Sequence, residues 1–414
     1  MGKIITNLEV TMEKLRMEFQ WLKTLWHARM IAIRRRIMHA LKQKFNPYPT
    51  APPDVSLSPS LRHRPNGVGA EMRLDWTRTS IDDVTIWQNK VRSKLIELTG
   101  YGRFGGPPAE KHSRECMGID GLKQRSLFLK VRDGLDLSIR MVWSPEIELE
   151  PSVPIMICLQ GTNSGMHLSW GETRMPADPI KIYNGADIAC QAAIRGFLAV
   201  CLEQSCFGER REQKLFRLSS TPCIDAANHA LLLGRSLIGE RASDVSSTVN
   251  WLCEGNPGFK IDKNSVYIMG SSAGGTTALF SAAMDERISG VIASSCIGFI
   301  KDTLLVRGDP EGQNVVPGIL RWFELDAVVS LVAPRPFLTV SGDQDHIWPF
   351  GGAKKVIDAA QPIFDSYAAG KCIDAISASG GHNFYPEITW PGFARLLRDS
   401  GHKLTNALNS EIQE

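Results

Sequence analysis

The chain has 414 residues, of which 43% are hydrophobic and 22% charged, so a collagen-like or wholly disordered protein is excluded. No apolar run reaches the roughly 18 residues of a transmembrane helix, and the charge near the N-terminus argues against a secretory signal. The nine Cys include no C-x-x-C pair, and an odd number cannot all be bridged. We therefore predict reduced thiols and a cytoplasmic location.

Positive charge is concentrated at one end of the chain, whose formal net charge is +3. Residues 1–46, the basic arm, hold ten Lys or Arg and three Glu, which leaves 37 basic and 41 acidic residues elsewhere. Apolar residues recur along the basic arm in steps of three or four, which predicts a long amphipathic helix. They are Leu8, Met12, Leu15, Phe19, Leu22, Trp26, Met30, Ile33, Ile37 and Leu41.

Two interpretations of the basic arm remain open. Its apolar stripe favours packing on the rest of the chain or on a second copy, which would make the protein a homo-oligomer. Peripheral contact with a membrane is the alternative, because Trp21, Trp26 and the cluster at 34–36 suit anionic lipid. No recognition motif for nucleic acid accompanies the charge, so nucleic acid is not an expected partner.

A Pro-rich linker is predicted over residues 47–79. Six Pro between positions 47 and 65 argue against a regular helix there and favour an extended tether. A helix is then predicted to begin at Ser80, as its cap, and to end at Gly100. Residues 80–414 form the third predicted unit.

The pattern from about residue 115 onward predicts an α/β fold. Residues 126–130 and 135–142 flank an Arg-Asp-Gly turn and predict an antiparallel hairpin. Short apolar runs separated by helix-length segments then predict strands that are covered on both faces, at 154–159, 197–202, 266–269, 291–293, 337–340 and 372–376. We expect a mostly parallel central sheet with helices on both faces.

A possible nucleophile follows one of these strands. Residues 270–274 read G-S-S-A-G between the strand and a helical segment, and this context places the central Ser272 on a tight, strained turn with its hydroxyl exposed. A non-reactive Gly-rich turn or a phosphate-binding turn is the alternative. The chain contains neither G-x-x-x-x-G-K-[ST] nor G-x-G-x-x-G, which argues against the usual nucleotide sites.

A serine hydroxyl needs a base and a carboxylate to act as a nucleophile at neutral pH. Asp343 and Asp345 both lie on the loop after the strand at 337–340, and we prefer Asp345 because Asp343 is better placed to cap that loop. His382, on a Gly-rich loop after the last strand, is the preferred base; His346 is a rival, but its adjacency to Asp345 disfavours it. The chain order Ser, Asp, His is that of the α/β-hydrolases.

Two backbone N–H groups are the expected donors to a developing oxyanion. Ala273 follows the nucleophile and supplies one, and Thr162, after the strand at 154–159, supplies the other. The predicted substrate pocket is formed by loops after the strands and by an insertion at about 297–322. Its predicted lining residues are Gln160, Met166, His167, Trp170, Trp348 and Phe384.

The chain resembles the acetyl-xylan-esterase-like and dienelactone-hydrolase-like branch of the α/β-hydrolases over about residues 80–405. The motifs that carry the resemblance lie at 160–161, 207–210, 231–237, 270–275, 285–287, 333–336 and in the two loops that hold Asp345 and His382. The chain departs from the family by Gln160 before Gly161, where relatives often have His, and by the basic arm. The resemblance implies an α/β-hydrolase fold and a serine esterase.

The residues therefore predict hydrolysis of a small carboxylic ester, with a short-chain acyl or acetyl group, through Ser272, His382 and Asp345. No metal and no organic cofactor is required by this chemistry. A serine peptidase or an acyltransferase with the same three residues is an alternative, as is a non-catalytic binding protein with a hydrolase fold.

Overall fold

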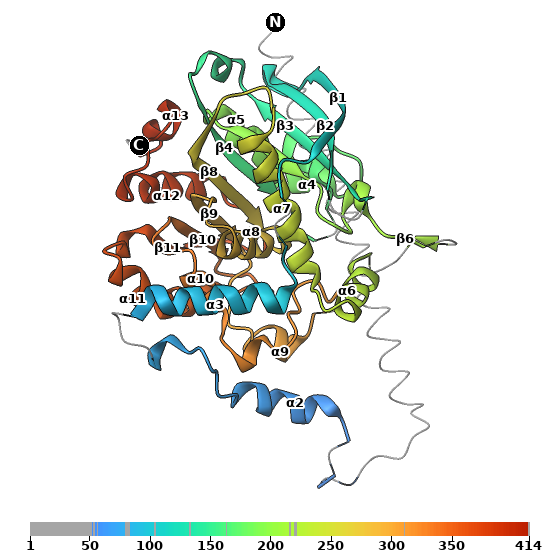
Figure 1. Ribbon diagram of the computed structural model, residues 1–414, viewed down its shortest axis with the longest axis vertical. Helices are drawn as coiled ribbons and strands as arrows, with labels where there is room; N and C mark the ends of the chain where they lie inside the picture. The colour runs from blue at the N-terminus through green and yellow to red at the C-terminus, as the bar shows by residue number, and fades with distance from the viewer. Residues whose placement is uncertain are drawn as a thin grey trace, which may run out of the picture.

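The computed structural model describes residues 52, 54–55, 57–78, 83–102, 105–131, 134–162, 164–214, 217–218, 222–309 and 311–412 (Figure 1). The basic arm, and with it the predicted amphipathic helix, lies outside the described residues. So does Ser80, the predicted helix cap.

A nine-stranded sheet organises the described residues, in the order β1-β2-β3-β5-β4-β8-β9-β10-β11. Each neighbouring pair from β5 to β11 is parallel, and the pairs at the β1 edge are antiparallel. The strands are β1 (Ala109–Met117), β2 (Lys123–Lys130), β3 (Asp136–Trp143), β4 (Val153–Leu159), β5 (Leu198–Leu202), β8 (Ile261–Ser271), β9 (Gly290–Ser294), β10 (Phe337–Gly342) and β11 (Ile373–Ala378). A separate short hairpin pairs β6 (Gln213–Lys214) with β7 (Arg217–Leu218).

Helices cover both faces of the sheet, because strand residues alternate between two hydrophobic cores. In β4, Ile155 and Ile157 face one core, with side chains from α3 (Val84–Thr99), α7 (Leu237–Glu254), α8 (Ala273–Met284), α10 (Leu325–Ser330) and α11 (Phe350–Ser366). Met156 and Cys158 face the other core, with side chains from α5 (Ile188–Ile194), α12 (Pro386–Asp399) and α13 (Asn406–Ser410). The remaining helices are α2 (Pro59–Val68), α4 (Asp178–Lys181), α6 (Pro222–Leu232) and α9 (Leu304–Arg307).

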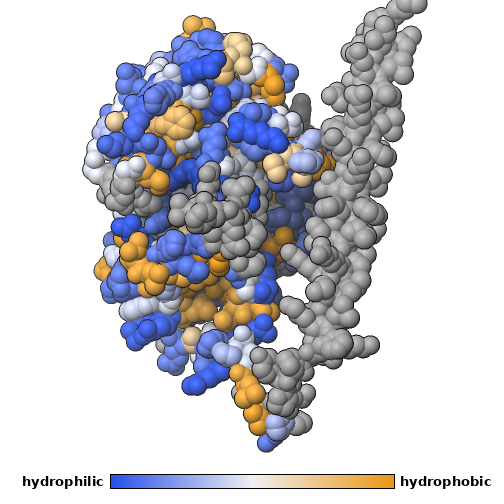
Figure 2. All heavy atoms as spheres, turned by 90° about the vertical axis from the view of Figure 1, so that its right-hand side faces the viewer, coloured by the Kyte–Doolittle hydropathy of each residue, from blue (hydrophilic) through white to orange (hydrophobic). Residues whose placement is uncertain are grey.

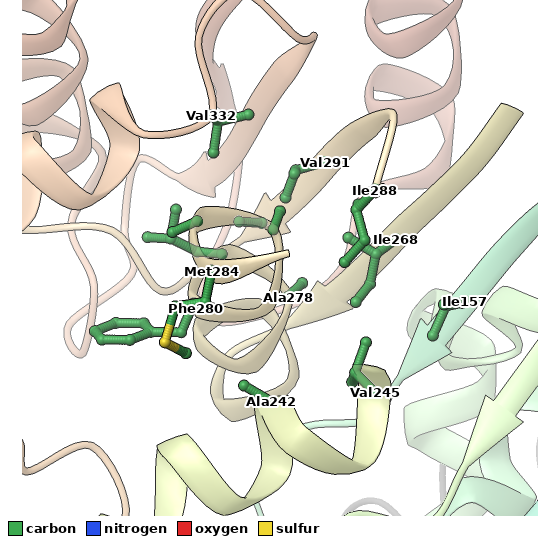
Figure 3. Close-up of a cluster of buried hydrophobic side chains, with 14 of the residues drawn as sticks. Ile157, Ala242, Val245, Ile268, Ala278, Phe280, Met284, Ile288, Val291 and Val332 are labelled. Atoms are coloured by element: carbon green, nitrogen blue, oxygen red, sulfur yellow. The ribbon is translucent and has the colours of Figure 1, made fainter. Parts of the chain in front are cut away.

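The first core surrounds helix α8, which carries the residues after Ser272. Figure 3 shows Ala278 of α8 facing Ile268 of β8 and Val291 of β9, with Met284 of α8 in the same cluster. All four side chains are buried. Helix α8 therefore packs against the sheet along its length. This packing fixes the position of the turn that leads into the helix.

The predicted α/β fold with a mostly parallel sheet is confirmed. All six predicted parallel strands are present, and the predicted hairpin is the β2–β3 pair, in which Lys130 opposes Asp136. The sequence pattern missed β1, because this edge strand is polar and mostly exposed and so has no buried face to give it an alternating pattern. Helix α3 ends as predicted at Gly100, whose φ of 64° is left-handed.

The prediction of no helix in the linker is wrong, because α2 occupies residues 59–68. Pro59 stands at the first helical position, where its missing N–H leaves no hydrogen bond unmade. Helix α2 packs on α9, where Arg64 donates to the Val306 carbonyl oxygen over 2.7 Å and Gly67 approaches the Leu305 side chain. These contacts support the short helix despite Pro65 in its interior.

The surface is mostly hydrophilic on the face drawn in Figure 2, with apolar patches in its lower half. Leu232 and Leu233, at and just after the end of α6, are among the most exposed apolar side chains of the described residues. No helix among the residues in the structure has the length and apolar character needed to cross a bilayer.

The close packing of the β8–α8 turn predicts a large cost for a side chain at Gly270. In a Gly270→Ala variant the new Cβ would lie 2.7 Å from the Gly275 nitrogen and nearer still to Gly274, so the backbone must shift. We expect a loss of roughly 2–3 kcal/mol in the free energy of unfolding, measured by urea denaturation. Gly351→Ala is the control, because a Cβ there meets nothing within 4 Å; equal midpoints for the two variants would contradict the prediction.

Candidate active site

Ser272 occupies a strained turn between β8 and α8. Its φ of 54° and ψ of −123° lie in a region of backbone conformation that residues other than glycine rarely adopt. The turn is held by hydrogen bonds from the Ser272 N–H to the Ser294 carbonyl oxygen, 2.9 Å, and from the Thr276 N–H to the Ser272 carbonyl oxygen, 3.0 Å. The structure therefore has the strand–turn–helix geometry that the sequence predicts for a nucleophilic serine.

The two glycines of the pentapeptide permit close contact between backbones. A Cβ on Gly274 would collide with the carbonyl group of Leu159 at the end of β4, and a Cβ on Gly270 would collide with Gly274 itself. Gly161 lies against the turn as well, since its Cβ would be 3.4 Å from the Ser272 Cβ. Because these glycines have no side chains, the β4 loop can lie in contact with Ser272.

Asp345 and His382 are in direct contact, as predicted. His382 Nδ1 and Asp345 Oδ2 are 2.7 Å apart. The second oxygen of Asp345 accepts the backbone N–H groups of Ile347 and Trp348, at 2.8 and 2.9 Å. Asp345 is buried, whereas His346 is exposed. A fixed carboxylate on Nδ1 leaves Nε2 as the free nitrogen of the His382 imidazole.

The pKa of the Asp345 carboxyl is below its usual value. Burial of the carboxyl raises this pKa, but the hydrogen bonds from His382 and from the backbone of Trp348 and Ile347, together with the nearby imidazole, outweigh burial. The carboxyl is consequently ionised at neutral pH and is suited to orient an imidazole and to stabilise it when protonated.

Three contacts position the loop that carries His382. Asp343 accepts the Gly380 N–H over 2.9 Å, so this residue holds the loop, consistent with the predicted capping role. Tyr385 donates its hydroxyl to the Gly381 carbonyl oxygen over 2.6 Å, and Ser295, at the end of β9, donates to the Asn383 carbonyl oxygen over 3.3 Å. The loop is thereby tied to the ends of β10 and β9.

The loop after β4 is fixed by glutamines. The Gln160 side-chain amide donates to Ser169 Oγ and to the Ala186 carbonyl oxygen, both at 2.7 Å. Gln204 donates to the Gln160 carbonyl oxygen over 2.5 Å and accepts the Thr277 hydroxyl of α8 over 2.7 Å. The β4 loop and helix α8, which bear Thr162 and Ala273, are therefore linked by a continuous hydrogen-bonded path.

Sequence reasoning missed two residues behind Thr162. Gln313, from the insertion, donates its amide to Thr162 Oγ1 over 2.9 Å. Its amide oxygen accepts Arg241 Nη1 over 2.9 Å, and Arg241 is fully buried in α7, with its guanidinium 4.4 Å from the Phe207 ring centre. Only the position of Gln313 in the predicted insertion pointed to the pocket; neither residue belongs to a motif.

A cavity of about 670 Å³ brings the predicted groups together. Its lining includes Ser272, Ala273, Thr162 and His382, and also the predicted pocket residues Gln160, Trp348 and Phe384. Lys181 and Arg307 add positive charge to the wall, and Arg307 lies over the Trp348 ring at 4.5 Å. Within the described ranges, no three His, Cys, Asp or Glu side chains are grouped so that they could hold a metal ion.

Three predicted pocket residues do not line this cavity: Met166, His167 and Trp170. The 3₁₀ turn Met166–Trp170 directs Met166 and Trp170 into the second core. His167 is buried and contacts Asp178 Oδ2 through Nε2 at 2.9 Å. Leu168, within the same turn, lines the cavity instead. The prediction of substrate contact by these three residues is therefore corrected.

A buried carboxyl lies behind the β4 loop, at the end of β5. Glu203 is 2% exposed and accepts the N–H groups of Met166 and Glu209, at 3.0 and 3.2 Å. Burial raises its pKa to about 7, although these two hydrogen bonds and the charge of Arg210 lower it. The ionised carboxylate is thus disfavoured in the folded protein.

Comparisons with known proteins agree with this geometry. No model of a known protein family matches the chain. A Bacillus subtilis (strain 168) protein named "Putative hydrolase YtaP" is 23% identical over 193 residues, which are 45% of this chain and 60% of that protein. The chain thus spans less than two thirds of the length of this relative.

Solved structures identify the fold. An acetyl xylan esterase, so described provisionally, from Bacteroides fragilis NCTC 9343 superposes with a TM-score of 0.61 at 15% identity, over 84% of this chain and 92% of that one. A glucuronoyl esterase from Teredinibacter turnerae T7901 gives 0.58 at 15% identity, over 85% and 94%. Another, from Solibacter usitatus, gives 0.56 at 13% identity, over 80% and 94%. The chain has the α/β-hydrolase fold, as the sequence predicts.

The raised pKa of Glu203 predicts a dependence of stability on pH. The folded-state pKa of about 7 exceeds the unfolded value of about 4.3. The free-energy cost of burying the ionised carboxylate is therefore absent below about pH 4.3 and complete above pH 7. Relative to Glu203→Gln, the wild type should therefore lose on the order of 2 kcal/mol between pH 5 and pH 8. Urea denaturation of both proteins at the two pH values measures this, and a constant difference would contradict it.

Proposed function

We propose that the protein hydrolyses carboxylic esters, with Ser272 as nucleophile, His382 as base and Asp345 as the carboxylate that orients the base. The observation that carries this proposal is the strained turn that presents Ser272 to the same cavity as the His382 imidazole, whose other nitrogen is held by buried Asp345. The named activities of the solved relatives, acetyl xylan and glucuronoyl ester hydrolysis, support it.

The mechanism follows from these positions. Ser272 Oγ attacks the ester carbonyl carbon while His382 Nε2 takes the hydroxyl proton. His382 then gives this proton to the departing alcohol, and an acyl-enzyme remains. Water repeats the sequence with His382 as base and releases the acid. Asp345, ionised and hydrogen-bonded to Nδ1, stabilises the imidazolium that forms in each half-reaction.

The oxyanion that forms in each step is stabilised by the N–H groups of Ala273 and Thr162. Ala273 is the first residue of α8, so its N–H also lies at the positive end of the helix dipole. Thr162 is held by Gln313, and its loop is held by Gln204. Each oxyanion donor typically contributes about 3 kcal/mol to lowering the barrier.

The cavity dimensions suit a small ester with a short-chain or acetyl acyl group. Trp348 and Phe384 provide apolar surface in the cavity wall, and polar side chains such as Thr162 and Gln313 line other parts of it. Peptide hydrolysis or acyl transfer to another alcohol would use the same three side chains, and these activities differ from ester hydrolysis only in the leaving group or the acceptor.

We further propose a cytoplasmic location and association of copies through the basic arm, with peripheral membrane contact as the alternative. The apolar stripe and net positive charge of residues 1–46 support these proposals. The proposed chemistry needs neither a metal nor an organic cofactor, and no nucleic acid partner is proposed.

Removal of the Ser272 hydroxyl should abolish the reaction. For a Ser272→Ala variant we expect kcat for p-nitrophenyl acetate to fall at least about 10⁴-fold, together with loss of the initial burst of p-nitrophenol. The kcat of His382→Ala should fall to a similar degree. The kcat of the double variant should fall no further, because the two residues act as a unit. Stopped-flow absorbance measures both the burst and the steady state.

Ser281→Ala is the matched control, because its hydroxyl lies on the same helix and donates to the Thr277 carbonyl oxygen, outside the cavity. Its activity should stay within twofold of the wild type. Undiminished hydrolysis by Ser272→Ala would eliminate the proposed function.

Loss of the Gln313 amide should slow catalysis through Thr162. We expect Gln313→Leu to lower kcat about tenfold with little change in KM, because a displaced oxyanion donor weakens transition-state stabilisation more than ground-state binding. The control is Gln361→Leu, on α11 outside the cavity. A rise in KM at constant kcat would instead assign Gln313 to substrate binding.

A further inference from the structure

An uncompensated lysine lies in the wall of the cavity. Lys181, at the end of α4, is only partly exposed, and its Nζ donates to Ser164 Oγ over 3.0 Å. No carboxylate among the described residues lies within the 4 Å of an ion pair with this ammonium group. An ammonium group has three donors, and a hydroxyl oxygen carries no charge to balance it.

Asp178, the acidic residue of the same helix, already has hydrogen-bond partners. Asp178 Oδ2 accepts the N–H groups of Arg174 and Met175, at 2.9 and 2.7 Å, and contacts His167 Nε2 at 2.9 Å. Burial lowers the pKa of Lys181, and the charge of Asp178 only partly opposes this effect. The folded protein therefore holds an incompletely neutralised positive charge at this position.

The acidic residues of the cavity wall, Asp309 and Glu311, also have partners of their own. The Asp309 oxygens accept the backbone N–H groups of Glu311 and Asn314, at 3.1 and 2.8 Å. Glu311 interacts with the Cys223 thiol. Arg307 has no ion-pair partner within 4 Å in the part of the chain that is described; burial lowers its pKa, and the nearby charges of Asp309 and Asp345 oppose this effect. The cavity wall thus carries two basic side chains that form no ion pair within 4 Å among the described residues.

Lys181 lines the same cavity as Ser272 and His382 and is connected to the loop that contacts Ser272. Ser164, its partner, closes the turn that begins at Gly161, with the Ser164 N–H donating to the Gly161 carbonyl oxygen over 3.2 Å. Thr162 lies within this turn, and Gly161 packs against Ser272. Lys181, Ser272 and His382 line one cavity, so an anionic group of an ester that occupies this cavity can reach the Lys181 ammonium group.

We propose that the substrate is an acidic ester, whose free carboxylate is bound by Lys181. This inference rests on the proposed ester hydrolysis and specifies its substrate class. The carboxylate supplies the charge that Ser164 does not, and Lys181 acts as a point charge that accepts it without a fixed bidentate geometry. Because the partly buried site excludes bulk water from one side of the pair, the interaction is less screened than an exposed ion pair.

The test compares esters that differ by one negative charge. Monomethyl glutarate and dimethyl glutarate place the difference on the acyl side, and acetoxyacetate and its methyl ester place it on the alcohol side. For the full-length wild type we expect kcat/KM for the acidic member of at least one pair to exceed that of the neutral member at least tenfold. A Lys181→Met variant should lose this preference, and Lys181→Arg should retain part of it.

Lys354→Met is the control, because Lys354 is exposed on α11 and pairs with Asp358. This variant should keep the wild-type preference. Should Lys181→Met fail to fold, as judged by its thermal transition, Lys181→Gln takes its place, and the wild-type preference still decides whether the substrate is acidic. Hydrolysis of p-nitrophenyl acetate without preference for either acidic ester overturns the inference and leaves the proposed function standing. No hydrolysis of any of the five esters overturns the proposed function itself.

Discussion

The site depends on the close contact between two backbones, where the turn after β8 meets the end of β4. Gly274 touches the Leu159 carbonyl group, and Gly161 touches Ser272, so the proposed nucleophile and the proposed oxyanion loop are placed by main-chain packing. Helix α8 packs in the larger hydrophobic core, which fixes the position of the turn that makes this contact. Side chains can vary around such a contact, but its spacing cannot change without moving Ser272 relative to the amides that would serve it.

Much of the fold was predictable because buried parallel strands have a simple signature. The predicted runs of the inner strands are apolar because the sheet is covered on both faces, whereas the run at 372–376, at the edge, contains Asp374; all six runs are strands in the structure. The edge strand β1 lacks this signature because water covers much of it. Helix α2 was missed for a different reason: Pro65 argued against it, and its contacts with α9 are not visible in local sequence.

Candidate site residues were predictable where chemistry requires a particular residue at the end of a strand. Ser272, Asp345 and His382 each follow a strand that is easily recognised, and the parallel topology brings those strand ends to one edge. His167 and Trp170 were assigned to the pocket from proximity in sequence alone, whereas a single 3₁₀ turn decides which of its side chains face the cavity. Gln313 and Arg241 are joined to Thr162 only by tertiary contacts, which no local pattern encodes.

The path from Arg241 through Gln313 to Thr162 joins helix α7, the insertion and the β4 loop. Insertions of this kind are where hydrolase folds diverge most freely, because loops tolerate replacement better than the sheet does. In this protein the insertion also contacts Thr162, a proposed oxyanion donor, through Gln313. In the proposed mechanism, selectivity and turnover are therefore coupled, and remodelling the insertion for a new ligand would be tolerated only where the register of Gln313 is preserved.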